Sequence, residues 1–213
     1  MEKQRFIFDI DGTLLVPDYS YEKTYFKNIL SKDDADVFIP MISKLLADYE
    51  NTYRRYDMKK LSRYLTAHSG ILITEAMIKG WKAAWSDTEP KIIDGIVDTL
   101  EELSSRDKDL VILTNWFLEP QITRLKQAGI KDYFTDFYGG EFAIKPHAES
   151  FRIACGRYHM EECVMIGDSL DKDIYAAMAA GLDSIYFNLN NNDNFDKNKV
   201  KSIGSMRDLE RMI

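Results

Sequence analysis

Short apolar runs typical of buried β-strands alternate along most of this chain with segments of helical periodicity. Buried strands of parallel sheets are almost continuously apolar, whereas surface helices repeat apolar residues every three or four positions. The alternation predicts an α/β fold, doubly wound around a mainly parallel, Rossmann-like sheet with right-handed crossovers. The strand-like runs lie at residues 5–8, 109–113, 134–138, 163–167 and 184–187, and the main helical segments at 93–103, 119–129, 148–157 and 171–180.

The stretch from residue 16 to residue 90 breaks this alternation, because it contains helical patterns but no strand-like run. Apolar side chains recur there at i, i+3 and i+4, first in residues 38–49 and again in 61–68 and 77–85. Pro40 falls inside the first pattern, so that helix is expected either to start near it or to bend there. We therefore predict an α/β core domain of residues 1–15 and 91–213, and an inserted α-helical cap domain of residues 16–90.

The charge balance and the cysteine content exclude several classes of partner. The formal net charge of the 213 residues is −7, and a nucleic-acid or anionic-membrane surface would need a clustered positive field, so neither partner is expected. Cys155 and Cys163 are too few and too oddly spaced for a disulfide scaffold or a zinc site. The sequence shows no signal-like stretch and no membrane-length apolar run, which favours a cytoplasmic protein. A monomer is the default expectation, and a dimer is the alternative.

Two carboxylates two residues apart, Asp9 and Asp11, follow the first strand-like run. Side chains at i and i+2 of a strand point to the same side, so both carboxylates are expected at one spot. Their repulsion there must be offset by a cation or a proton, and a divalent-metal site would supply the cation. Taken alone, the pair also fits an ordinary strand–turn junction in which an Asp and Gly12 cap the turn.

Polar residues also follow the later strand-like runs. Because ligands of open α/β sheets bind outside the carboxyl ends of the strands, we expect these residues to converge on one edge. A hydroxyl, an ammonium group and several carboxylates suit phosphoryl transfer, and carboxylates suit Mg²⁺. No G-x-x-x-x-G-K-[ST] segment is present, so a P-loop nucleotide site is not supported. The residues are Thr114 and Asn115 after the second run, Lys145 after the third, and Asp168 and Asp173 after the fourth.

Together these residues form four short motifs whose order resembles that of the haloacid dehalogenase superfamily. Each motif follows the expected kind of strand, and the resemblance covers essentially the whole chain. Within the superfamily, the chain is similar to the metal-dependent phosphatases. The motifs are Asp9-Ile10-Asp11-Gly12-Thr13, then Thr114, then Lys145-Pro146, and finally Gly167-Asp168-Ser169 with Asp173.

The resemblance implies catalytic and metal-binding roles for the acids. Asp9 would be the nucleophile that forms an aspartyl-phosphate, which splits hydrolysis into two displacements. Asp11 would be the general acid for the leaving oxygen and then the base for the attacking water. Mg²⁺ would be held by the Asp9 carboxylate, the main-chain carbonyl of Asp11 and the Asp168 carboxylate.

The resemblance also implies roles for the residues that bind the phosphate. Thr114 and the backbone at Asn115 would hold phosphate oxygens, and Lys145 would pair with both the nucleophile and the phosphate. Asp173 would position Lys145 or a metal-bound water. Trp116 and Phe117, which come directly after the second motif, would either line the entrance of the site or pack in the core.

The expected activity is Mg²⁺-dependent hydrolysis of a small phosphorylated metabolite, with the cap closing over the substrate. Haloalkanoate dehalogenases of this superfamily lack the second acid of the first motif and phosphonate hydrolases carry Ala there, whereas this chain has Asp11. A phosphomutase acting on a sugar phosphate would use the same carboxylates and remains an alternative. A non-catalytic protein that binds a phosphorylated ligand is a further, less supported alternative.

Overall fold

The computed structural model describes residues 2–211 and contains one parallel β-sheet. Within these residues the sheet has six strands in the order β3-β2-β1-β4-β5-β6, and every neighbouring pair is parallel. The order places β1 next to β2 and β4, so that three motif-bearing strands are adjacent. This confirms the predicted α/β, Rossmann-like fold. The strands are β1 (Arg5–Phe8), β2 (Asp109–Leu113), β3 (Asp136–Tyr138), β4 (Cys163–Gly167), β5 (Asp183–Phe187) and β6 (Lys201–Ile203).

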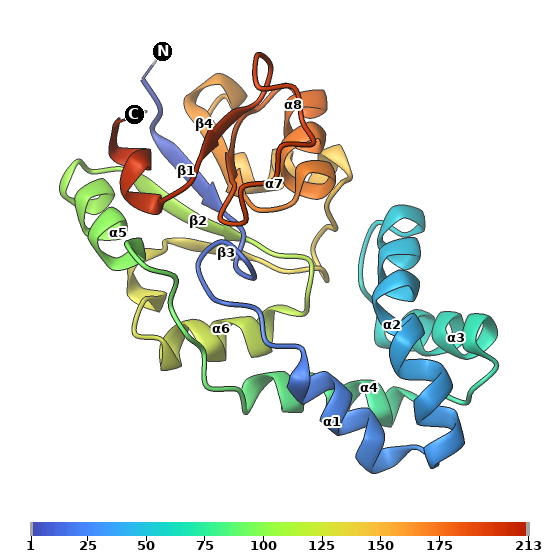
Figure 1. Ribbon diagram of the computed structural model, residues 1–213. Coiled ribbons are helices and arrows are strands. Elements are labelled where there is room, and N and C mark those ends of the chain that lie inside the picture. Colours follow the sequence, from blue (N-terminus) through green and yellow to red (C-terminus); the bar gives the residue numbers. More distant parts are fainter. Residues whose placement is uncertain (1, 212–213) are drawn as a thin grey trace.

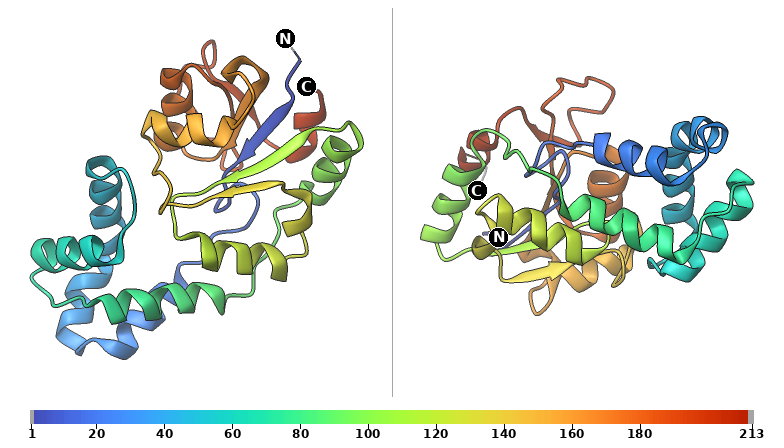
Figure 2. Two further views of the ribbon diagram at one scale, coloured as in Figure 1. Left: turned by 180° about the vertical axis from the view of Figure 1, so that it is seen from behind. Right: turned by 90° about the horizontal axis from the view of Figure 1, so that it is seen from below.

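Helices cover both faces of the sheet (Figures 1 and 2). On one face, Phe6 and Phe8 of β1 pack in a core with α5 (Ile96–Ser105) and α6 (Leu118–Gln127). Ile7, between them, points to the other face, where α7 (Ala148–Cys155) and α8 (Ala176–Ala180) pack. This alternation follows from the two-residue repeat of a strand, and burial on both faces explains why the strand sequences are continuously apolar. Within the described residues there are also four short helical turns: η1 (Lys131–Tyr133), η2 (Met160–Glu162), η3 (Leu170–Tyr175), which is a π-helical turn, and η4 (Met206–Arg211), with η3 leading directly into α8.

Residues between β1 and α5 form a helical unit beside the sheet, at the lower right of Figure 1. Its aromatic-rich core is separate from the two sheet cores and includes Phe26, Phe38, Tyr49 and Trp81. No described helix is long and apolar enough to cross a membrane. The helices are α1 (Ser20–Ile29), α2 (Lys32–Thr52), α3 (Met58–Ser69) and α4 (Glu75–Ser86).

Helix α2 runs through Pro40 instead of starting near it. It begins at Lys32, where the Ser31 side chain accepts a hydrogen bond from the Asp34 N–H at 3.1 Å. A serine N-cap of this kind satisfies one of the free N–H groups of the first turn and so fixes the helix start. The alternative that the helix starts near Pro40 is therefore wrong, because the cap and the packing of Phe38 outweigh the lost backbone hydrogen bond.

The two chain segments that join the helical unit to the sheet run side by side. Val16 N–H donates to Lys91 O at 2.8 Å, and Ile93 N–H donates to Leu14 O at 3.0 Å. Both connections therefore leave the sheet next to the loop that follows β1. The predicted domain boundaries, at residues 15/16 and 90/91, lie at this paired crossing. That the chain forms two separate domains remains a prediction.

Two details of the sheet differ from the sequence prediction. β3 is shorter than the run at 134–138, because Phe134 follows η1 and packs in the sheet core before the strand begins. β6 was not predicted, because its three residues are too few to show a periodicity. It pairs with β5 through Ile185 opposite Lys201 and Phe187 opposite Ile203. The predicted loop over 188–199 and the final short helix, η4, lie on either side of it.

Candidate active site

The loop after β1 turns the Asp9 side chain over the carboxyl edge of the sheet. The Asp9 N–H still donates to Ile166 O of β4 at 3.0 Å, so this residue is fixed by the sheet itself. Gly12 has a φ of +85°, and a Cβ there would lie 2.1 Å from Asp168 Oδ2. Only glycine allows both this backbone conformation and this close approach. The glycine of the first motif therefore brings the loop into contact with the fourth motif.

Three carboxylates from the first and fourth motifs meet at this edge. One oxygen from each of Asp9, Asp168 and Asp173 lies within 4.8 Å of the other two. The pKa of Asp168 is raised to about 7, mainly by its partly dehydrated position and further by the charges of Asp9 and Asp173. A cation bound among these oxygens would relieve that repulsion, and an all-oxygen donor set suits a hard ion such as Mg²⁺. The residues present therefore fit a magnesium ion.

Lys145 places a buried ammonium group between two of these acids. Its Nζ lies 2.9 Å from Asp9 Oδ1 and 2.6 Å from Asp173 Oδ1, and its side chain is 2% exposed. Burial alone would lower the pKa of Lys145, but the charges of Asp173 and Asp9 outweigh burial and raise it. Lys145 is therefore a permanent cation beside Asp9. The Asp173 carboxylate also accepts the Ser169 N–H at 3.0 Å, which fixes its orientation.

Asn115 holds the Lys145 loop with its side chain. Its Nδ2 donates to Lys145 O, and its Oδ1 accepts the Lys145 N–H, both at 2.8 Å. The Asn115 amide thus donates to and accepts from the backbone of one residue, as a neighbouring β-strand would. These two hydrogen bonds join the end of β2 to the loop after β3. The structure thus shows a positioning contact for the Asn115 side chain, whereas the predicted phosphate contact concerns its backbone.

Asp11 is held by two residues that the sequence did not single out. Arg124 Nη1 lies 2.7 Å from Asp11 Oδ1, and Gln121 Nε2 donates to Asp11 Oδ2 at 2.8 Å. The same Gln121 nitrogen donates to Thr114 Oγ1 at 3.1 Å. Burial raises the pKa of Asp11, while Arg124 and Gln121 oppose the increase. The side chain of Asp11 therefore points toward α6, away from the three-carboxylate cluster.

The sequence holds only a weak signal that these two residues contact the site. Gln121 and Arg124 lie three positions apart, so they share one face of α6, but polar residues at that spacing are typical of a solvated helix surface. In the structure both are at most 1% exposed, and the Arg124 guanidinium also lies 4.8 Å from the centre of the Trp85 ring. Helix α6 therefore directs these two polar side chains toward the site, while its other charged residues stay exposed.

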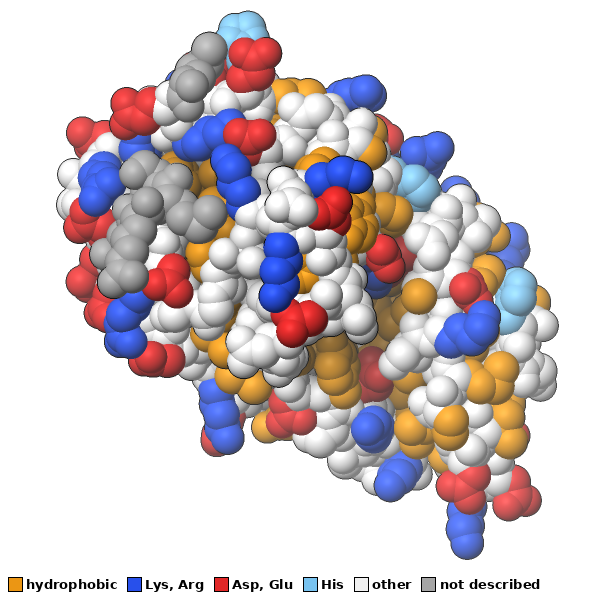
Figure 3. Space-filling view, turned by 45° about the horizontal axis from the view of Figure 1, so that its top comes forward, with side chains coloured by type: hydrophobic (Ala, Val, Ile, Leu, Met, Phe, Trp, Pro, Cys, Tyr) orange, Lys and Arg blue, Asp and Glu red, His pale blue; other side chains and the backbone are white. Residues whose placement is uncertain are grey.

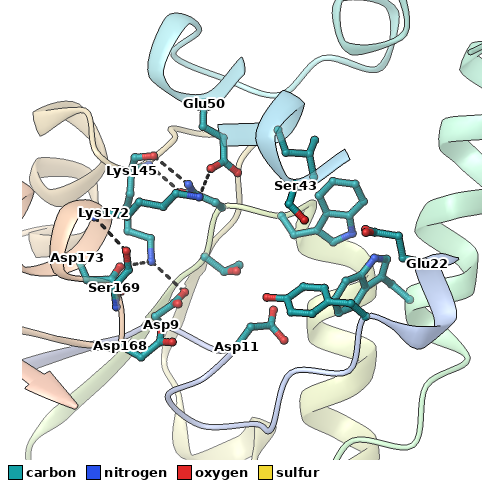
Figure 4. A pocket seen from close by; sticks show the side chains of 16 residues that line it. Asp9, Asp11, Glu22, Ser43, Glu50, Lys145, Asp168, Ser169, Lys172 and Asp173 are labelled. Carbon is teal, nitrogen blue, oxygen red and sulfur yellow. Dashed lines mark hydrogen bonds and ion pairs between the residues drawn. The ribbon is translucent and has the colours of Figure 1, made fainter. Parts of the chain in front are cut away.

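The predicted residues line one cavity between the sheet and the helical unit. The cavity has a volume of about 300 Å³, and the face of the molecule in Figure 3 shows a groove with acidic side chains between these two parts. Figure 4 shows Asp9, Asp168 and Lys145 on the sheet side and Glu22 on the helical side. All seven predicted site residues line it: Asp9, Asp11, Thr114, Asn115, Lys145, Asp168 and Asp173.

Several contacts hold the helical unit against the sheet domain. Tyr56 N–H donates to Gly140 O at 2.8 Å, and Ile144 N–H donates to Arg54 O at 2.9 Å. The buried Glu50 carboxylate accepts a hydrogen bond from Tyr56 Oη at 2.7 Å and pairs with Lys172 of η3. The cavity is therefore covered by the helical unit in this conformation.

The residues after the second motif take different positions. Trp116 lines the cavity and is also part of the aromatic core of the helical unit, so it fulfils both predicted alternatives. Phe117 is buried in the same core, and does not line the cavity.

A parallel α/β sheet with acids, a buried lysine and a hydroxyl at its carboxyl edge, covered by a helical unit, defines a hydrolase of the haloacid dehalogenase type. A model of the haloacid dehalogenase-like hydrolase family matches residues 4–181, and the chain belongs to this family. The family and the hydrolase class predicted from the four motifs are therefore confirmed.

Similar proteins support this assignment. The pyrimidine 5′-nucleotidase PynA of Streptococcus pneumoniae is 28% identical over 85% of this chain and 82% of its own length. The structure of YfnB from Bacillus subtilis, solved with bound magnesium, aligns over 100% of this chain and 99% of its own with a TM-score of 0.73 and 22% identity. A phosphatase of the same superfamily from Thermococcus onnurineus aligns over 100% and 97% with a TM-score of 0.65 and 24% identity.

Proposed function

We propose that this protein is a Mg²⁺-dependent phosphatase that hydrolyses a small phosphomonoester. The observation that carries the proposal is the meeting of Asp9, Lys145, Asp168 and Asp173 at the carboxyl edge of the sheet, with Asp11 and Thr114 in the same cavity. Phosphoryl transfer needs positive charge, oriented donors and a nucleophile in line with the leaving oxygen. This set of residues supplies each of them.

In the proposed reaction, an Asp9 carboxylate oxygen attacks phosphorus and the bond from phosphorus to the leaving oxygen breaks. Asp11 donates its proton to that oxygen, so that a neutral alcohol leaves and an aspartyl-phosphate remains on Asp9. Burial raises the pKa of Asp11, which helps it to keep the proton that this step needs, although Arg124 and Gln121 oppose the increase. Asp11 then takes a proton from water as the water attacks phosphorus. The second displacement releases inorganic phosphate and regenerates Asp9.

Magnesium, when bound, would neutralise phosphate charge and hold the phosphate beside Asp9. Asp9 and Asp168, whose carboxylates lie close together, would hold it with the Asp11 main-chain carbonyl that the family resemblance implies. Lys145, which pairs with Asp9, would offset the charge that remains on Asp9 and the phosphate, and the Thr114 hydroxyl, which lines the cavity, would donate to a phosphate oxygen. Asp173 orients Lys145 through their 2.6 Å ion pair.

The cavity favours small substrates. Its volume of about 300 Å³ is at the lower end of the range for metabolite sites, about 300–1,000 Å³. The contacts of Glu50, Tyr56 and Ile144 across the cover leave little room for a protein loop. A phosphorylated metabolite is therefore a better substrate than a phosphoprotein, and the nucleotidase activity in the name of PynA is one example of such chemistry.

Phosphate release from p-nitrophenyl phosphate tests the proposal with the Asp9→Asn variant. We expect at least a thousandfold loss of kcat and an unchanged circular dichroism spectrum, because the amide is isosteric but not nucleophilic. Asp171→Asn is the matched control, since Asp171 is exposed and lies outside the cavity. Chelation should abolish turnover and Mg²⁺ should restore it.

Wild-type rates in Asp9→Asn would disprove the mechanism. With a sugar phosphate as the substrate, an isomeric phosphorylated product in place of free phosphate would identify a phosphomutase.

A further inference from the structure

Glu22 of helix α1 directs a buried carboxyl into the active-site cavity from the helical side. Its residue exposure is 5%, and Figure 4 shows the carboxyl across the cavity from Asp9. Among residues 2–211 it forms no ion pair, and the Trp81 indole N–H that interacts with it stays outside hydrogen-bonding geometry. A buried carboxyl without a counter-charge is costly unless it keeps its proton or a ligand satisfies it. The reaction proposed above assigns no role to this group.

The cavity has no spare cation for a second anion on the substrate. Of the described lysines and arginines that line it, Lys145 pairs with Asp9 and Asp173, and Lys172 pairs with Glu50. A second phosphate or a carboxylate on the substrate would therefore face acidic side chains without a counter-charge. The geometry favours a leaving group that is uncharged and offers a hydrogen-bond donor.

Aromatic side chains form much of the same wall. Tyr19, Trp85 and Trp116 line the cavity together with Glu22. Rings of this size present broad surfaces against which a flat, partly apolar group packs well. A planar nitrogen heterocycle fits this wall better than an open-chain alcohol or a polyol.

The protonation of Glu22 suits a base edge in which a donor and an acceptor are adjacent. Burial raises the pKa of Glu22 to about 7, and the Trp81 indole and Lys23 oppose the increase. Near neutral pH much of the carboxyl therefore keeps its proton and presents a hydroxyl donor beside a carbonyl acceptor. The edge of uracil, with an N–H beside a carbonyl, is complementary to this pair.

We propose that Glu22 hydrogen-bonds to the base edge of a nucleoside monophosphate, and that this contact selects nucleotides over other small phosphomonoesters. The inference rests on the proposed phosphatase function and adds to it a substrate class and the residue that recognises it.

Three variants and three substrates test this contact. Glu22→Gln keeps a donor beside an acceptor, Glu22→Leu removes both, and Thr24→Leu changes an exposed residue of α1 outside the cavity as the control. The substrates are uridine 5′-monophosphate, its 3-methyl derivative, which lacks the N–H, and ribose 5-phosphate, which lacks the base. We expect Glu22→Leu to lower kcat/KM for uridine monophosphate by about 10- to 100-fold, mostly through KM. Glu22→Gln should stay within about threefold of wild type, a margin of about 0.65 kcal/mol.

The two modified substrates separate recognition from folding. Wild type should prefer uridine monophosphate to both of them, and Glu22→Leu should lower kcat/KM for both by much less than for uridine monophosphate, so that the preference is lost. Equal losses on all three substrates, or an unchanged preference in Glu22→Leu, would overturn the proposal.

Binding without turnover separates this proposal from the phosphatase mechanism. In an Asp9→Asn background, quenching of tryptophan fluorescence by uridine monophosphate should be retained with Glu22→Gln and weakened with Glu22→Leu. Equal binding by these two variants would disprove the contact even if the mechanism were correct. A failure of the mechanism would instead appear as wild-type turnover in Asp9→Asn itself.

Discussion

The buried carboxyl of Glu22 should make the stability of the protein depend on pH, and Glu22→Gln should remove that dependence. An exposed glutamate titrates near 4.5, whereas burial raises the pKa of Glu22 to about 7. Between these values the unfolded chain has lost a proton that the folded chain keeps, so stability falls as pH rises. At about 1.4 kcal/mol per pH unit, the full effect is about 3 kcal/mol, and the part between pH 5 and pH 8 is about 2.5 kcal/mol.

Urea unfolding at pH 5, 6, 7 and 8 measures this effect. All three tryptophans of the chain lie in the aromatic core of the helical unit, so their fluorescence reports on the region around Glu22. The free energy of unfolding of Glu22→Gln minus that of wild type should rise by about 2.5 kcal/mol from pH 5 to pH 8. With a urea slope of about 2 kcal/mol per molar, the midpoint difference grows by about 1 M.

The difference between variant and wild type isolates Glu22 from the other titrating groups. The groups that interact with its charge are Lys23 on the same helix, Tyr19 just before it and Tyr56 across the helical unit, and all of them are unchanged in the variant. Glu75→Gln, on the exposed surface of α4, is the matched control and should show no such trend. A wild-type–variant difference that stays constant within about 0.5 kcal/mol across this pH range would refute the reasoning.

Three further changes test other contacts. Gly12→Ala should abolish turnover and weaken Mg²⁺ binding, measured by calorimetry, at least tenfold. The reason is that the new Cβ would lie 2.1 Å from Asp168 Oδ2. A normal Mg²⁺ affinity would contradict this. Arg124→Met should lower kcat by about 10- to 100-fold with little change in KM, because Asp11 loses its 2.7 Å ion pair; unchanged kcat would exclude a positioning role. Trp81→Ala should cost about 3–5 kcal/mol in chemical unfolding, because the side chain is fully buried; a loss under 1 kcal/mol would show that the aromatic core collapses around the gap.

The sheet and the convergence of its acids could be predicted because they follow from local patterns. Continuous apolar runs identify strands that are buried on both faces, and polar residues directly after them must lie at one edge of a parallel sheet. Asp9 and Asp168 are separated by most of the chain, yet their place relative to a strand end was enough to bring them together.

Contacts between helices and the site could not be predicted in the same way. The roles of Gln121, Arg124 and Glu22 depend on which helix face turns toward the cavity, and helical periodicity alone does not fix that direction for polar residues. Each of them resembles a solvated surface residue in the sequence, and only tertiary packing makes each of them buried. β6 was missed for a different reason, because three residues are too few to show a pattern.

The paired crossing of the chain at Val16–Lys91 and Leu14–Ile93 has a consequence for how such enzymes diversify. Since the inserted helices leave and rejoin the sheet at one point, their length and sequence can change without lengthening any strand or shifting its register. If the proposed function holds, the groups that would contact the leaving alcohol can thus be exchanged as a module, while those that would act on phosphorus stay in place. New specificities can therefore arise on this scaffold without rebuilding its chemistry.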